Sequence, residues 1–207
     1  MALWAQMNPL LLVLAGPAGS GKSTLCDRLV KERPEFSRVV TTTTRAPRTG
    51  EIDGVHYHFL APLEFRRRIA NGDFLEWTQV HGDQEDRLYG TLRSSVLDPL
   101  AHGRDLVMNI DVKGVDALRQ IARSEAILRR SMATVFIRID HARIVERMKA
   151  RDGEQIEEIR RRIATADREL LEAPKFDFVI ESRTRDEDFS DLLRIDSEAR
   201  RRLDCAA

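Results

Sequence analysis

The stretch Gly16–Thr24 constrains the fold of this chain more than any other part of the sequence. It reads GPAGSGKST, which has the pattern G-x-x-x-x-G-K-S, and it lies between the apolar run Leu10–Ala15 and a helix-like pattern over Leu25–Val30. A buried strand, a glycine-rich turn and a helix in this order are typical of a phosphate-binding loop, in which backbone N–H groups and the positive end of the helix dipole face phosphate oxygens. The sequence therefore predicts a site for a nucleoside triphosphate. The alternative is a surface glycine turn that matches the pattern by chance.

Two side chains of this loop have distinct expected roles. Lys22 is expected to reach the terminal phosphates of ATP, and the hydroxyl of Ser23 is expected to bind Mg²⁺. The residues predicted to bind the ATP cofactor are Gly16, Pro17, Ala18, Gly19, Ser20, Gly21, Lys22, Ser23 and Thr24.

The composition excludes several classes of function. The 207 residues include 34 basic and 34 acidic ones, so the net charge is zero and there is no broad electrostatic attraction to nucleic acid or to an anionic membrane. The apolar run at 10–15 is too short to span a bilayer. Two cysteines form neither a disulfide framework nor a metal cluster, which favours a reducing, cytoplasmic location.

The order of the remaining patterns predicts an α/β fold. We expect a parallel sheet flanked by helices, with a small, mostly β insert after the second strand. The residue ranges expected to form strands are 10–15, 38–44, 55–59, 74–80, 105–111, 134–139 and 176–180. After the helix that follows the loop, the ranges expected to form helices are 62–71, 94–102, 141–172 and 186–203.

A second polar stretch indicates where an acceptor phosphate binds. In Thr43–Arg48, which reads TTRAPR, two arginines stand three apart on a loop that a proline stiffens, so they can grip one phosphate from two sides. Tyr57 adds a neutral hydroxyl donor. Exposed arginine loops are common, so this stretch by itself is a weak signal.

Taken together, the motifs resemble those of guanylate kinases. The resemblance covers roughly residues 10–180, in order. It is carried by the phosphate loop, Thr43-Thr44-Arg45-x-Pro47-Arg48-x-Gly50-Glu51, Gly54-x-x-Tyr57-x-Phe59, Phe74-Leu75-Glu76, Tyr89-Gly90-Thr91 and Ile110-Asp111-Val112-Lys113-Gly114. The resemblance implies a single domain over 1–207 that consists of a core, a GMP-binding insert and a mobile lid. The implied ranges are about 8–41, 104–145 and 168–207 for the core, 42–103 for the insert and 146–167 for the lid.

The same resemblance assigns roles to individual residues. It implies that the GMP phosphate is bound by Arg45, Arg48, Tyr57 and Tyr89. It implies that guanine is read by Thr41, Glu76, Thr91 and Asp111. A carboxylate suits this task, because guanine presents N–H donors at N1 and N2 that adenine lacks as a pair, and an unpaired buried carboxylate is costly. Without the resemblance, Glu76 reads as a carboxylate at the rim of an edge strand.

Three arginines of the expected lid complete the implied catalytic set. Arg147 and Arg151 are four residues apart and therefore share one face of a helix, and Arg162 follows after Gly153. The resemblance implies that they cover the triphosphate and neutralise the transferring group. The residues implied to be catalytic are Lys22, Arg45, Arg147, Arg151 and Arg162. Because the acceptor is already an anion, the reaction needs positioning and charge neutralisation rather than a base.

The sequence departs from the family pattern at several places. The loop 82–88 before Tyr89 is longer than usual, Asn109 stands where an acid is common, and Glu181 stands where an asparagine is usual. The lid sequence Arg151–Glu154 also differs from the usual Arg-Gly-Thr-Glu. These departures bear on the placement of Tyr89, the efficiency of the reaction and the choice of nucleotide donor.

Two other functions are compatible with parts of the sequence. One is a related kinase that acts on another small phosphorylated acceptor such as ribose 1,5-bisphosphate, although a sugar phosphate gives Thr41, Glu76 and Thr91 no base edge to read. The other is a guanylate-kinase-like module that binds proteins without catalysis, although such modules typically have degraded phosphate loops, whereas Lys22 and Ser23 are present here. We expect ATP and GMP as small-molecule partners and a monomer or a homodimer.

Overall fold

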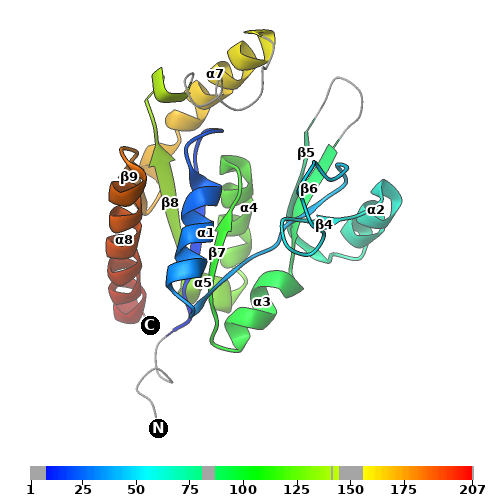
Figure 1. Cartoon of the computed structure of the whole chain (residues 1–207). Coiled ribbons are helices and arrows are strands. Elements are labelled where there is room, and N and C mark those ends of the chain that lie inside the picture. The colour runs from blue at the N-terminus through cyan, green and yellow to red at the C-terminus, as the bar shows by residue number, and fades with distance from the viewer. Residues whose placement is uncertain (1–7, 81–86, 141, 145–155, 207) are drawn as a thin grey trace.

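The computed structural model describes residues 8–80, 87–140, 142–144 and 156–206 (Figure 1). In this part of the chain the central sheet has five strands in the order β2-β7-β1-β8-β9, and all neighbouring pairs are parallel. These strands are β1 (Leu11–Ala15), β2 (Phe36–Arg38), β7 (Asp105–Asn109), β8 (Met132–Arg138) and β9 (Phe178–Glu181). The expected α/β class with a parallel sheet is confirmed.

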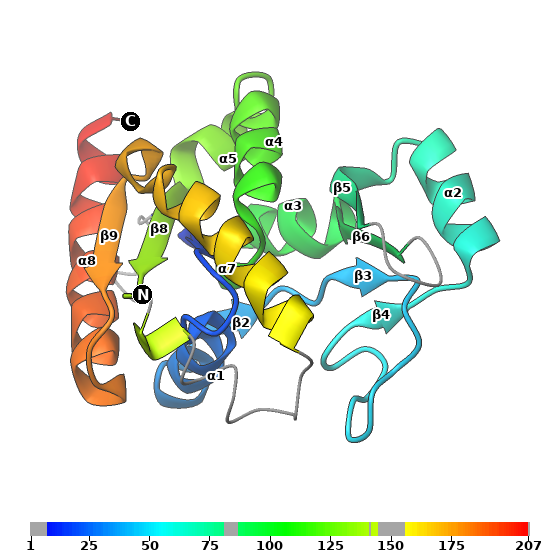
Figure 2. The same ribbon diagram turned by 90° about the horizontal axis from the view of Figure 1, so that it is seen from above.

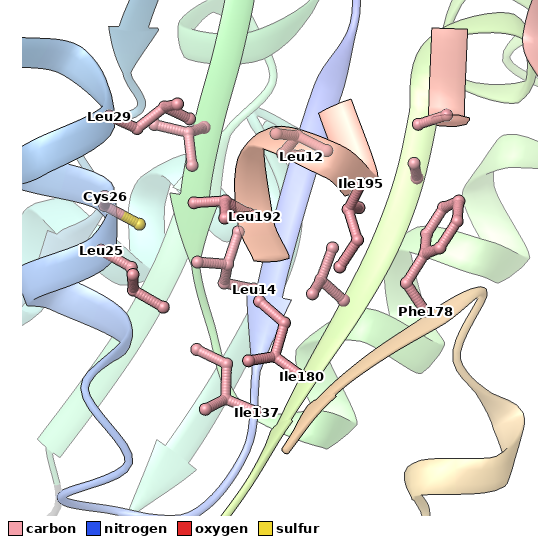
Figure 3. Packing of buried hydrophobic residues seen from close by; sticks show 14 of the residues in the cluster. Leu12, Leu14, Leu25, Cys26, Leu29, Ile137, Phe178, Ile180, Leu192 and Ile195 are labelled. Carbon is pink, nitrogen blue, oxygen red and sulfur yellow. The ribbon is translucent and has the colours of Figure 1, made fainter. Parts of the chain in front are cut away.

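Strand β1 lies in the middle of this sheet and is buried on both faces, as its uninterrupted apolar sequence predicts. Alternate residues point to opposite sides of a strand, so Leu12 and Leu14 pack on one face against α1 (Lys22–Glu32) and α8 (Arg185–Ala206) (Figure 3). On the other face, Leu11 and Val13 belong to a second cluster. That cluster includes buried side chains of α3 (Ser94–Ala101), α4 (Val112–Ala122) and α5 (Ala126–Ser131).

A second sheet stands beside the first and carries the expected insert. Its order is β4-β3-β6-β5 among the described residues, and β5 and β6 form its longest antiparallel pair. These strands are β3 (Thr42–Thr43), β4 (His58–Phe59), β5 (Phe74–Val80) and β6 (Arg87–Leu92). Helix α2 (Pro62–Ala70) packs on this sheet through Phe65, which stacks on Phe74.

Two expected elements differ from the structure. The strand predicted over 38–44 is wrong as a single element, because the chain leaves the central sheet after Arg38 and joins the second sheet at Thr42. The β-branched run therefore serves two sheets. The strand predicted over 55–59 is reduced to His58–Phe59, and the short helix α5 was not predicted.

The two sheets are joined by more than the chain crossings. Arg93, which precedes α3, forms an ion pair with Glu125, which precedes α5. Helix α4 of the core lies against β5 of the insert. Helix α7 (Ile156–Leu170) lies over the edge of the central sheet at which β1, β7 and β8 end, as both views show (Figures 1 and 2).

The last helix is fixed at the opposite end of the sheet by a cluster of charges. Arg200 donates to Asp105 at the start of β7 (2.6 Å) and to Asp196 one turn earlier in α8 (2.8 Å). Asp105 also accepts the backbone N–H of Leu10 (2.8 Å), which ties β1, β7 and α8 together. Among the described residues, no helix is long and apolar enough to cross a membrane.

Candidate active site

The phosphate-binding loop has the predicted strand–turn–helix geometry. It runs from the end of β1 at Ala15 to the start of α1 at Lys22, and Gly16, Gly19 and Gly21 all have positive φ angles, of 137°, 82° and 100°. A Cβ atom at Gly16 would lie 2.5 Å from the carbonyl oxygen of Ile137. Only glycine fits this position, so the pattern of glycines follows from the backbone path.

The lysine of the loop is folded back onto the loop itself. Lys22 Nζ donates to the carbonyl oxygens of Gly16 (2.5 Å) and Pro17 (2.9 Å). Burial lowers the pKa of Lys22 to about 8, and the negative charge of Glu169 opposes this shift. The hydroxyl of Ser20 is buried and has no hydrogen-bond partner among the described residues. The three glycines with positive φ let the backbone of this loop turn its N–H groups toward one ligand, which fits a bound polyphosphate.

Ser23, in the first turn of α1, is exposed at the edge of this loop, and Asn109 Nδ2 donates to its hydroxyl oxygen (3.3 Å). The described residues contain no cluster of three or more His, Cys, Asp or Glu side chains that could hold a metal ion. Magnesium in nucleotide sites is usually held by one or two protein oxygens together with phosphates and water. A single serine hydroxyl beside a polyphosphate loop therefore fits Mg²⁺.

A cavity of about 290 Å³ opens between the phosphate loop and the insert. Five of the residues predicted to bind the acceptor line it, namely Thr41, Tyr57, Glu76, Tyr89 and Asp111, together with Gly16, Ala18 and Lys22 of the phosphate loop. A second cavity, of about 670 Å³, lies on the other side of the loop, and Lys22 borders both. The second cavity is lined by the loop residues from Ala18 to Thr24, except Ser20, and by Leu25, Arg28, Arg185 and Asp188.

A buried carboxylate forms one wall of the smaller cavity. Glu76 is only 7% exposed and accepts a hydrogen bond from the hydroxyl of Thr91 (2.6 Å), its partner on the neighbouring antiparallel strand. Burial raises the pKa of Glu76 to about 7, the bond from Thr91 opposes the shift, and the charge of Asp111 adds to it. The site therefore holds a carboxylate that gains from an external pair of donors.

Asp111 approaches the same place from the core. It is the N-cap of α4, and its side chain accepts the backbone N–H of Gly114 (2.7 Å). A Cβ atom at Gly114 would lie 3.3 Å from Asp111 Oδ1 and 3.4 Å from Glu76 Oε2. A glycine at this position thus lets the two carboxylates, one from each sheet, share one side of the cavity.

The predicted phosphate-binding residues of the insert are held by an acidic neighbour. Arg45 has an 8% exposed side chain and makes a two-pronged ion pair with Glu51 (2.8 and 2.9 Å). The hydrogen bonds from Arg45 hold the pKa of Glu51 low, at about 2. The guanidinium of Arg45 also lies over the ring of Tyr57, which meets Tyr89 edge to face.

Arg48 stands apart from this group. Its backbone N–H donates to Glu51 (2.7 Å) and the residue is exposed, and neither Arg45 nor Arg48 is among the described residues that line the cavity. The structure therefore brings Arg45, Tyr57 and Tyr89 together and leaves Arg48 exposed, outside this group.

The comparisons with known proteins agree with this geometry. The family profile described as guanylate kinase matches residues 7–198. The chain belongs to the guanylate kinase family. A guanylate kinase of Nitratidesulfovibrio vulgaris is 40% identical over 172 residues, which are 83% of this chain and 78% of that protein. A guanylate kinase of Wolinella succinogenes is 41% identical over 186 residues, which are 89% and 82% of the two chains.

A solved structure shows the same fold. The crystal structure of guanylate kinase from Anaplasma phagocytophilum superposes with a TM-score of 0.70 at 23% identity, and the match covers 94% of this chain and 87% of that one. The resemblance inferred from the motifs is confirmed.

Several residues assigned from the guanylate kinase pattern lie outside the described part of the chain. Arg147 and Arg151 are among them, and so is most of the long loop before Tyr89. Arg162 lies in α7, but its side chain is outside the description.

Two of the departures from the guanylate kinase pattern can be located. Asn109 lies between Ser23 and Arg38, whose Nη2 donates to the Asn109 oxygen (3.2 Å). Glu181 is exposed at the end of β9 and pairs with Arg138 (2.5 Å). The neighbouring Ser182 is buried and donates to Asp188, which borders the larger cavity.

Five residues that line the smaller cavity were not among the predicted site residues: Thr78, Gly90, Asn109, Ile110 and Glu169. Glu169, near the end of α7, lines the smaller cavity, and burial raises the pKa of its carboxyl to about 6 while the charge of Lys22 opposes the shift. Glu169 stands seven residues after Arg162 and therefore lies on the same face of the helix. This spacing is the feature of the sequence that could have identified it as a site residue.

Proposed function

We propose that this chain transfers the γ-phosphate of MgATP to GMP, and also to dGMP, giving ADP and GDP. The observation that carries the proposal is the juxtaposition of a phosphate-binding loop and two carboxylates, the buried Glu76 and the exposed Asp111, around one cavity. The loop accounts for the donor and the carboxylates account for the acceptor.

The acceptor base is selected by hydrogen-bond polarity. Thr91 uses its only hydrogen on Glu76, so the remaining lone pairs of that carboxylate require donors from the ligand. Guanine supplies N1–H and N2–H as a pair, and Thr41 at the cavity wall offers a hydroxyl for O6. Adenine lacks this pair of donors and would leave Glu76 unpaired, at a cost of about 1–3 kcal/mol or more.

The acceptor phosphate is assigned to Arg45, Arg48, Tyr57 and Tyr89. Arg45 and the hydroxyls of Tyr57 and Tyr89 form a compact group of donors beside the cavity. When the phosphate binds, it takes the place of Glu51 as the partner of the Arg45 guanidinium. Arg48, which lies exposed outside this group, then closes on the phosphate.

The donor nucleotide is assigned to the phosphate loop and the larger cavity. The loop residues Gly16 to Thr24, apart from Pro17, which has no backbone N–H, would hold the phosphates with backbone N–H groups, and Ser23 would hold Mg²⁺, which would neutralise phosphate charge. The ribose and base then extend toward Arg28, Arg185 and Asp188.

Transfer needs no base, because the attacking group is a phosphate oxygen that is already anionic. Lys22 borders both cavities, so it can leave its two loop carbonyls and follow the transferring group between donor and acceptor. Arg147, Arg151 and Arg162 supply further positive charge in this proposal, which places them in a lid over about 146–167. The division into core, insert and lid, the cytoplasmic location and a monomeric or homodimeric state remain predictions.

The first experiment measures ADP release from MgATP with GMP, dGMP, AMP, CMP, UMP and ribose 1,5-bisphosphate as acceptors. We expect turnover with GMP and dGMP, and at least a hundredfold weaker turnover with the others, roughly as expected when a buried polar group is left unpaired. Turnover confined to ribose 1,5-bisphosphate would refute the guanine site but keep the phosphate loop. No turnover with any acceptor, although ATP binds, would favour a binding module.

A further inference from the structure

A row of three polar side chains lies beside the phosphate loop, and the proposed mechanism uses only the last of them. Arg38 ends β2, and its Nη2 donates to Asn109 Oδ1 (3.2 Å). Asn109 ends β7, and its Nδ2 donates to Ser23 Oγ (3.3 Å). Arg38 is held on its other side by an ion pair with Asp27 of α1. The row connects the edge strand of the sheet with the hydroxyl assigned to Mg²⁺.

The chemistry of arginine fixes the direction of this row. A guanidinium has only hydrogen-bond donors, whereas an asparagine amide has an oxygen that accepts and a nitrogen that donates. Only the oxygen of Asn109 can therefore face Arg38, and the nitrogen must face Ser23. As a result, the hydroxyl oxygen of Ser23 accepts a hydrogen bond from the protein.

This direction changes what Ser23 offers to a ligand. A hydroxyl has two lone pairs and one hydrogen, so a bond from Asn109 leaves one lone pair for a cation and leaves the hydrogen free for a phosphate oxygen. If the amide were turned over, its oxygen would accept the hydrogen of Ser23, and both lone pairs would be available to a cation. The orientation of one amide thus sets the balance between phosphate and Mg²⁺ at this hydroxyl.

We propose that Arg38 is a positioning residue for the nucleotide site. By holding the amide of Asn109, it makes the Ser23 hydroxyl accept a hydrogen bond from the protein and donate one to phosphate. As a result, Mg²⁺ adds less to the nucleotide affinity of the chain than it would with the amide turned over. The inference rests on the proposed function, because it requires a nucleotide in the phosphate loop. It concerns how strongly the metal contributes to binding, and not which acceptor is used.

The test is the affinity of the full chain for ADP, measured by titration calorimetry with excess Mg²⁺ and with excess chelator. The quantity of interest is the gain in affinity that Mg²⁺ brings. Arg38→Met keeps the stem and removes the donors, so the amide is free to turn and the gain should rise about three- to tenfold, the range of one hydrogen bond. Arg38→Lys keeps a donor for the Asn109 oxygen and should behave like the native chain.

Arg104→Met is the matched control. Arg104 lies at the far end of the same strands and donates to Ser37 (2.8 Å), so its removal should leave the gain unchanged. An unchanged gain in Arg38→Met, with ADP still bound, overturns the inference and leaves the proposed function intact. A rise that Arg38→Lys repeats in full also overturns it. Failure of the native chain to bind ADP overturns the proposed function together with the inference.

Discussion

Glu76 is the residue at which function and stability should conflict most clearly. Its carboxyl is buried and its pKa is raised from 4.5 to about 7, mainly by burial. At pH 8 the folded chain must hold this group ionised, whereas the unfolded chain ionises it freely. We therefore predict that Glu76→Gln stabilises the folded protein while it damages GMP binding.

The size and the sign of the stability effect follow from proton linkage. Because the folded state has the higher pKa, it binds more protons than the unfolded state between pH 4.5 and 7, so this group makes stability fall as the pH rises through that range. At 1.36 kcal/mol per unit, the shift costs about 3 kcal/mol at pH 8 and about 1 kcal/mol at pH 5.5. Glutamine never ionises and avoids this cost.

The assay is thermal unfolding of the native chain and the variant at both pH values. We expect the melting temperature of Glu76→Gln to exceed that of the native chain by roughly 5–10 °C at pH 8, and by much less at pH 5.5. Glu64→Gln is the control, because Glu64 is only partly buried and its hydrogen bonds from Arg68 and Arg67 lower its pKa, which predicts a small change of the opposite sign. An equal difference at both pH values would refute the linkage argument.

The functional half is measured with the same variant. A glutamine offers guanine one acceptor and one donor in place of two acceptors, so kcat/KM for GMP should fall about a hundredfold and the preference over AMP should shrink. In the native chain, KM for GMP should rise as the pH falls below about 7, because a protonated Glu76 loses an acceptor. An unchanged preference would exclude Glu76 from base recognition.

Three further substitutions test the phosphate loop, the second sheet and the charge cluster. Lys22→Ala should lower kcat by at least about a hundredfold at unchanged melting temperature in the absence of nucleotide, and near-native turnover would remove the lysine from the mechanism. Gly90→Ala would place a Cβ 2.8 Å from the carbonyl oxygen of Glu76, so urea unfolding should show a loss of about 1–3 kcal/mol, and full stability would contradict the close packing. Arg200→Met removes the cation paired with the half-buried Asp105 and leaves the buried Asp196 with Arg33 alone, so it should cost about 1–3 kcal/mol, whereas a loss below about 0.5 kcal/mol would show that the cluster contributes little.

The sequence predicted those parts of the site that depend on residues close together in the chain. The phosphate loop needs glycines at fixed positions, because Gly16 for example has no room for a side chain. The loop can therefore be recognised from the sequence pattern. The buried strand β1 is visible for a similar reason, since both of its faces are covered. The strand over 38–44 was predicted wrongly because β-branched residues favour extended backbone without saying which sheet they join.

The parts that the sequence could not predict depend on burial between distant segments. Glu169 acquires its raised pKa only because α7 folds back over the loop that carries Lys22, which is far away in the chain. The ion pair between Arg45 and Glu51 also could not be predicted from the sequence, because a charged loop is equally consistent with a solvated surface. The direction of the Asn109 amide depends on Arg38, a residue of a different strand.

The division of the acceptor cavity between two sheets has a consequence for how substrate affinity can change. Glu76 lies in the second sheet and Asp111 follows a strand of the central sheet, so in the proposed mechanism the fit of the base would depend on the angle between the two sheets as well as on the side chains themselves. The ion pair of Arg93 with Glu125 lies at this joint and outside the cavity lining. We expect substitutions there to alter the spacing of the two carboxylates without replacing any residue of the proposed site. Selection for a different GMP concentration therefore has a route that does not pass through the active site.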